Sequence, residues 1–138
     1  MDSGGRLLVA TAFGLVVAGT TILVIGMTVT FVSTDLTFIG ATASELEAVT
    51  DRLVPLVAHD RIGFGAGVLV GGLLIGAMAF FAEGRAARQV LVLAAVSAFG
   101  LAIAIHFAVG YTDFLHLAPA IGGAVSLLAG VALWRPDA

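Results

Sequence analysis

The sequence predicts an all-α membrane protein, an up-down bundle of four transmembrane helices with a short outer amphipathic helix between the first two. Three observations carry this prediction. Of the 138 residues, 60% are hydrophobic and only 11% are charged, whereas a soluble domain carries about 25% charged residues. The apolar residues form four long runs, and the last three runs are joined by short connections. Because so little polar surface cannot cover the chain in water, we expect its solvent to be lipid.

The composition also excludes several kinds of site and partner. The chain has no cysteine, so it has no disulfide, thiol nucleophile, thiolate metal site or iron–sulfur cluster. Its formal net charge is -3, which argues against nucleic-acid binding. Nothing in the sequence marks a second domain, and we expect residues 1–138 to form one transmembrane domain surrounded by membrane lipids.

The first predicted span covers about residues 7–33. At 1.5 Å per residue a helix of this length reaches about 40 Å, which exceeds the roughly 30 Å of the hydrocarbon core. The span must therefore tilt or protrude. No small-residue cleavage site follows it, which argues against a removed signal peptide.

The longest connection, residues 34–61, is predicted to contain an amphipathic helix over about residues 44–54. Two residue pairs near its start have the spacing of a capping box: Thr42 with Glu45, and Ser44 with Glu47. Apolar residues at helical spacing follow, and Pro55 disfavours helix at the residue before it, so the segment should break there. We expect this helix to lie on the outer membrane surface or to cap the bundle, with an ordinary solvated helix as the alternative.

The other three spans are predicted over about residues 62–82, 89–110 and 117–134. The second span is dense in small residues, and three of its glycines repeat every four residues: Gly63, Gly67 and Gly71. Helices in lipid pack closely where small residues let their backbones approach each other. These glycines are therefore expected at helix interfaces, and the short connections favour antiparallel neighbours in a bundle.

The arginines predict the orientation of the spans. Four of the six flank spans on one side of the membrane: Arg6, Arg85, Arg88 and Arg135. Arginine and lysine are enriched in cytoplasmic connections. The remaining two, Arg52 and Arg61, lie among acidic residues in the long connection. The pattern therefore predicts an integral protein of the cytoplasmic membrane with both termini in the cytoplasm.

Polar residues that can bind ligands or protons gather on the predicted outer side. The candidate metal ligands are the three histidines, His59, His106 and His116. The candidates for binding a ligand or handling protons are Asp60, Arg61, Tyr111 and Asp113. Ionisable groups within a span are functional candidates by default, because burying them in lipid is costly. The structural alternatives are a histidine bonded to a backbone carbonyl, helix capping by Asp60 or Asp113, and anchoring of Arg61 at the interface.

This outer set predicts a site for a metal ion, a small redox or lipid-like ligand, or protons. Imidazoles from different helices can hold a transition metal ion or a haem, and histidine titrates near neutral pH. No catalytic or metal-binding motif with diagnostic spacing is present. The main alternative is a non-catalytic accessory or assembly subunit of a larger membrane complex, or a homo-oligomer. A small transporter and a membrane enzyme acting on a lipid or quinone are further alternatives.

Two stretches resemble a known group of proteins. "LVPLVAHDRIGFGAG", which begins at Leu53, and "HFAVGYTDFLHLAPA", which begins at His106, resemble an uncharacterised family of small four-helix prokaryotic integral membrane proteins. The resemblance covers most of residues 34–120. It implies a four-helix membrane fold and carries no activity, cofactor or site residue.

Overall fold

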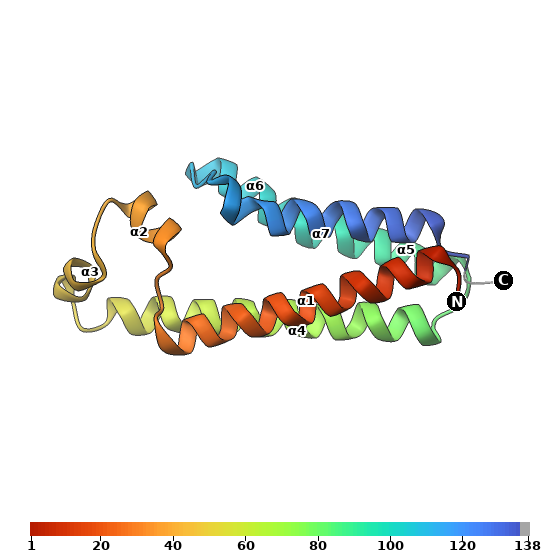
Figure 1. The fold of residues 1–138 in the computed structure, drawn as a ribbon, viewed down its shortest axis with the longest axis horizontal. Helices are drawn as coiled ribbons and strands as arrows, with labels where there is room; N and C mark the ends of the chain where they lie inside the picture. Colours follow the sequence, from red (N-terminus) through yellow and green to blue (C-terminus); the bar gives the residue numbers. More distant parts are fainter. Residues whose placement is uncertain (136–138) are drawn as a thin grey trace. The chain divides into compact units, whose positions relative to one another are not determined.

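The computed structural model describes residues 1–135, which are all-helical with no strand. Four long apolar helical stretches, each long enough to cross a membrane, pack as a bundle (Figure 1). They are α1 (Ser3–Thr28), α4 (Leu53–Phe81), the continuous run over residues 84–109, and α7 (Phe114–Leu133). The predicted fold class is confirmed.

The hydropathy pattern predicts a later end for the first membrane-spanning helix and a later start for the second. Helix α1 ends at Thr28 rather than near residue 33, because Thr30 takes a left-handed conformation (φ 58°) that turns the chain. Helix α4 begins at Leu53 rather than near residue 62. Pro55 lies in its first turn, where the missing backbone N–H has no intrahelical partner to lose. The helix break therefore lies before Leu53, and the proline does not cause it.

Two short helices, α2 (Ser33–Ile39) and α3 (Ala43–Val49), connect α1 to α4. Helix α3 corresponds to the predicted outer helix but ends at Val49. Its capping box is the Thr42–Glu45 pair: the Thr42 amide donates to Glu45 Oε2 over 2.8 Å, and the Glu45 amide donates to the Thr42 hydroxyl oxygen over 3.3 Å. The bonds from the Thr42 amide and hydroxyl lower the pKa of Glu45. Helix α2 was not predicted.

The third span is one continuous helical run with a wider turn in its middle. It consists of α5 (Gly84–Ala94), the π-helical turn η1 (Ala95–Phe99) and α6 (Gly100–Val109). Ser97 lies in this turn, and its hydroxyl donates to the carbonyl of Leu93, which precedes the turn. The Phe99 ring packs directly on α7, since a methyl group added at Gly123 would lie 2.7 Å from Phe99 Cε1. Gly123 thus leaves room on α7 for the Phe99 ring of the widened turn.

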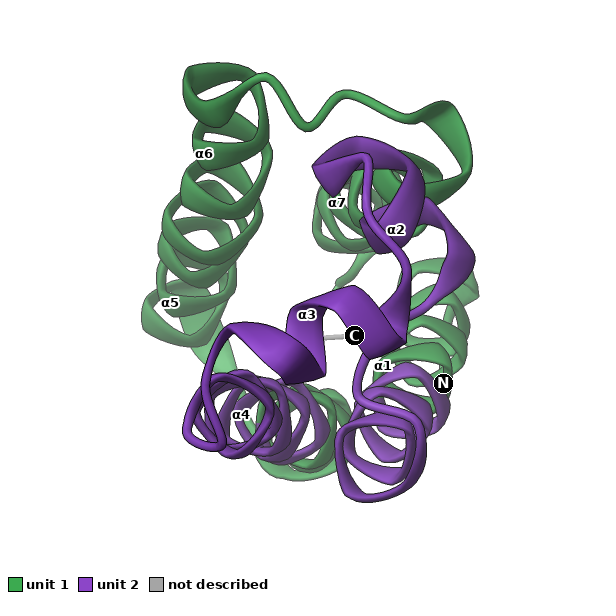
Figure 2. Cartoon of the chain, turned by 90° about the vertical axis from the view of Figure 1, so that its left-hand side faces the viewer, with its two compact units in different colours: residues 1–15, 71–138 green, residues 16–70 purple. Residues whose placement is uncertain are grey.

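The chain divides into two compact units, which Figure 2 colours separately. Unit 1 contains residues 1–15 and the described residues from 71 onward. Its core is centred on four fully buried side chains: Leu8, Leu91, Leu127 and Val131. Between α1 and α7, the Thr11 and Ser126 hydroxyls form a hydrogen bond of 2.6 Å. This pairing satisfies two polar groups inside an apolar helix interface.

At one end of unit 1, the start of α1 contacts the end of α7. A methyl group added at Gly4 would lie 2.1 Å from the Trp134 amide nitrogen, so the two backbones touch there. The Asp2 carboxylate accepts hydrogen bonds from the Gly5 amide over 2.7 Å and from the Arg135 amide over 2.6 Å. These bonds, the Gly5 bond foremost, lower the pKa of Asp2. The two segments are therefore fastened to each other at this end.

Unit 2, residues 16–70, depends on direct backbone contact between α1 and α4. A methyl group added at Gly19 would lie 2.4 Å from the Leu69 amide nitrogen, and one added at Gly65 would lie 2.6 Å from the Leu23 amide nitrogen. The Gly63, Gly67 and Gly71 series has no such neighbour within 4 Å, so these glycines do not mediate packing between the described helices of the chain. Two residues correspond to about 200° around a helix, so Gly65 lies on the opposite face.

The contact at Gly19 gives a testable prediction. Gly19→Ala should lower the free energy of unfolding by about 1–3 kcal/mol, because its methyl group would meet backbone atoms that cannot move aside. Gly14→Ala, in the same helix with open space around it, should be neutral or slightly stabilising. Reversible unfolding of both variants in mixed detergent micelles measures the difference. Equal stability of the two variants would contradict the close contact.

Candidate functional site

The turn between α6 and α7 brings three polar rings together. Gly110, in the left-handed conformation (φ 77°), ends α6, and the Tyr111 amide donates back to the His106 carbonyl over 2.9 Å. This is the bond pattern of a Schellman motif, for which glycine is the favoured residue. Asp113 then caps α7 by accepting the His116 amide over 3.0 Å. Local backbone chemistry thus positions the side chains of His106, Tyr111 and His116.

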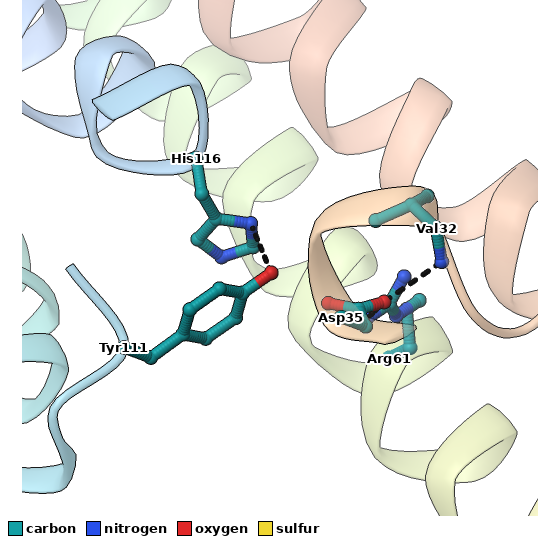
Figure 3. Close-up of polar contacts among 5 residues, drawn as sticks. All are labelled: Val32, Asp35, Arg61, Tyr111 and His116. Atoms are coloured by element: carbon teal, nitrogen blue, oxygen red, sulfur yellow. Dashed lines mark hydrogen bonds and ion pairs between the residues drawn. The ribbon is translucent and has the colours of Figure 1, made fainter. Parts of the chain in front are cut away.

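The three rings contact one another within unit 1, and we call them the His–Tyr–His cluster. The centroids of Tyr111 and His116 are 4.2 Å apart and stacked, and those of His106 and His116 are 5.0 Å apart. The Tyr111 hydroxyl and His116 Nδ1 are hydrogen-bonded over 3.1 Å (Figure 3). All three side chains are half-buried. The tyrosine hydroxyl and the two imidazole rings therefore form one group of side chains in mutual contact.

Hydrogen bonding also defines the tautomer of neutral His106. Its Nδ1 lies 2.5 Å from the Ala102 carbonyl oxygen, one turn earlier in α6. Because a carbonyl oxygen only accepts, Nδ1 carries the proton. The Nε2 atom of neutral His106 is therefore a proton acceptor. The predicted structural alternative, a bond from the ring to a carbonyl, is present and leaves this second nitrogen for chemistry.

In unit 2, a buried ion pair joins α2 to α4. The Arg61 guanidinium donates to Asp35 Oδ2 over 2.7 Å, and the Val32 amide donates to the same oxygen over 2.8 Å (Figure 3). The side chains of Arg61 and Asp35 are 19% and 7% exposed. Buried charges are retained only with such partners. Arg61 therefore anchors the short helix α2 to the second span.

Asp35 is a residue of this unit that is not among the predicted site candidates. Its sequence signal is weak: a single acidic residue in the long connection, near the end of the first apolar run. Asp35 and Arg61 are 26 positions apart in the sequence, and the segment between them carries no periodicity that relates the two. Only the position of α2 in the folded chain brings them together.

His59 and Asp60 form a second, exposed pair in unit 2. His59 Nδ1 and Asp60 Oδ1 are 3.0 Å apart, and the side chains are 83% and 72% exposed. The expectation that Asp60 caps the second span is wrong, because α4 begins at Leu53 and Asp60 lies inside it. Among the other candidates, Asp113 has the capping role proposed for it.

The described residues hold no group of three or more His, Asp or Glu side chains placed to bind a metal ion. Of the three candidate metal ligands, His106 and His116 belong to unit 1 and contact each other, whereas His59 belongs to unit 2 and pairs with Asp60. A metal site built from the three candidate histidines is therefore not seen in the described part of the chain.

Comparisons with known proteins add no identification: no family model, no curated protein and no solved structure matches the chain. The resemblance to the uncharacterised four-helix family stays a prediction.

The two ion pairs of unit 2 give a matched prediction. Asp35→Asn should lower the free energy of unfolding by about 3 kcal/mol or more, because it leaves the Arg61 charge buried without a counter-charge. Asp60→Asn should cost less than about 1 kcal/mol, because its pair is exposed. Unfolding in mixed micelles gives both values. Similar losses in the two variants would contradict the assignment of Asp35–Arg61 as the anchoring pair.

Proposed function

We propose that this four-span membrane protein takes up and releases protons through the His–Tyr–His cluster on the extracytoplasmic side of the cytoplasmic membrane. The observation that carries the proposal is the hydrogen bond between Tyr111 and His116 within stacking contact of a second histidine. Histidine is the side chain whose ordinary pKa, about 6.5, lies nearest to physiological pH. Chains of histidine and carboxylate side chains carry protons in membrane pumps and transporters.

The chemistry of the cluster follows from its donors and acceptors. When His116 Nδ1 is unprotonated, it accepts a hydrogen bond from the Tyr111 hydroxyl; when Nδ1 is protonated, it donates and the hydroxyl oxygen becomes the acceptor. His106 offers Nε2 as a second acceptor. A proton on one ring opposes a proton on the other, because the two imidazolium groups would lie close together. The cluster is therefore suited to carry one proton at a time.

The distribution of arginines supports the proposed orientation. Within unit 1, Arg88 donates to the Ala132 carbonyl near the end of α7, and Arg135 follows that helix. Arg6 is in the first turn of α1, whose start is fastened to the same end of α7. The His–Tyr–His cluster belongs to the turn that joins α6 to α7, at the opposite end of α7, and Figure 1 shows where this turn lies. With the arginine-rich end in the cytoplasm, the cluster faces outward and both termini face inward.

An accessory subunit of a larger membrane complex, or a homo-oligomer, is the second candidate. The open face of α4 at Gly63 and Gly67 favours it, because glycine faces in lipid allow another helix to approach closely. In this case the His–Tyr–His cluster would be a structural turn. A complex with a second membrane protein that survives mild detergent, together with a cluster insensitive to pH, would favour this candidate.

The chain offers an internal probe for the proposed function, since Tyr111 is its only tyrosine. Protonation of His116 reverses the direction of the tyrosine hydrogen bond and should change the near-ultraviolet tyrosine signal. We predict a reversible transition between about pH 5 and 8 in the purified protein. His116→Gln should abolish it, and His106→Gln should shift its midpoint. The single tryptophan, Trp134, does not titrate in this range.

His59→Gln is the matched control, because His59 is exposed and bonds only to its neighbour Asp60 among the described contacts. This variant should keep the transition of the natural protein. A tyrosine signal that is flat between pH 5 and 8, or a transition that survives in His116→Gln, would overturn the proposal.

A further inference from the structure

An open groove of about 530 Å³ lies along one face of the third span, away from the His–Tyr–His cluster. Its lining residues all come from α5 and η1: Arg85, Arg88, Gln89, Val92, Leu93 and Val96. Their spacing of three and four residues places them on one helical face. The groove therefore begins with two arginines at the start of the span and continues as an apolar surface.

No carboxylate within residues 1–135 pairs with either of the two arginines. Neither forms an ion pair within the described residues, and both are exposed. Arg88 donates one hydrogen bond, to the Ala132 carbonyl over 3.2 Å. A guanidinium has five N–H donors, so this bond orients the group and leaves further donors for a ligand. Glu83, the acidic residue nearest in sequence, makes no side-chain bond to the start of α5.

The apolar part of the groove continues from Arg88 toward the interior of the span. Val92, Leu93 and Val96 are all exposed. Residues 88 to 96 span about 12 Å along a helix, which reaches from the headgroup region into the upper part of the acyl chains. The groove thus has a cationic end and an apolar continuation, which match the phosphate and the acyl chain of a phospholipid.

We propose that this groove binds an anionic phospholipid from the leaflet on the arginine-rich side. Arg85 and Arg88 would hold its phosphate, since guanidinium groups match phosphate oxygens in geometry and charge. Val92 and Val96 would contact an acyl chain. A free phosphate would occupy only the arginine end and leave the apolar continuation without a ligand. The net charge of -3 does not favour anionic lipids by itself, so the preference must arise locally.

Native mass spectrometry of the detergent-solubilised protein tests this proposal by titration with phosphatidylglycerol, phosphatidylcholine and inorganic phosphate. We expect phosphatidylglycerol to bind at least tenfold more tightly than phosphatidylcholine. The double variant Arg85→Gln/Arg88→Gln should lose about tenfold or more of that affinity, as expected for two charge contacts near a membrane surface. Excess inorganic phosphate should not displace the bound lipid.

Arg52→Gln removes an exposed arginine between α3 and α4 and is the matched control. This variant should bind phosphatidylglycerol as the natural protein does. Equal losses in Arg52→Gln and the double variant would indicate diffuse charge attraction and overturn the proposal. So would displacement of the lipid by inorganic phosphate, or equal affinity for the two lipids. The single variants Arg85→Gln and Arg88→Gln, each expected to bind with intermediate affinity, keep the test valid if the double variant fails to fold.

Discussion

The hydrocarbon core of the membrane imposes the constraint on which this structure depends, because lipid offers no partner for backbone polar groups. Every N–H and C=O inside it must be satisfied within the protein, which restricts the spans to helices. The chain meets this requirement with four long apolar helices. Side-chain hydroxyls in the spans follow the same rule: Thr20, Thr21 and Thr28 each donate to a carbonyl one turn earlier. Charged side chains and the polar rings of histidine and tyrosine lie toward the ends of the spans.

Within that constraint, the helices pack most closely at glycines, where no side chain separates the two backbones. Apolar side chains gain little by leaving lipid for another helix, so close backbone approach supplies the attraction. Gly19 and Gly65 give this approach between α1 and α4, and Gly130 gives it between α7 and Leu8 of α1. Many large apolar side chains elsewhere remain exposed, including Phe81 and Phe13. This exposure suits a chain surrounded by lipid.

The sequence predicts features whose cause is local. The spans follow from hydropathy, the Thr42–Glu45 box from its spacing, and the cap of α7 from Asp113 preceding an apolar run. It could not predict which glycine face packs, because the Gly63 series and Gly65 carry the same local signal. The Asp35–Arg61 pair and helix α2 depend on contacts between distant segments. The His–Tyr–His cluster is an intermediate case. Its successive residues are five positions apart in the sequence, and the glycine turn brings them together.

The proposed orientation places the titratable rings of the cluster on the outer side of the membrane and four of the six arginines on the cytoplasmic side. Because the chain has no native cysteine, single cysteines can report this arrangement in intact cells. Thr112→Cys lies in the turn beside the cluster and Ala86→Cys near the start of α5, both at exposed positions. A membrane-impermeant maleimide should label Thr112→Cys in intact cells and Ala86→Cys only after lysis. Labelling in the reverse pattern, or equal labelling of both before lysis, would contradict the account.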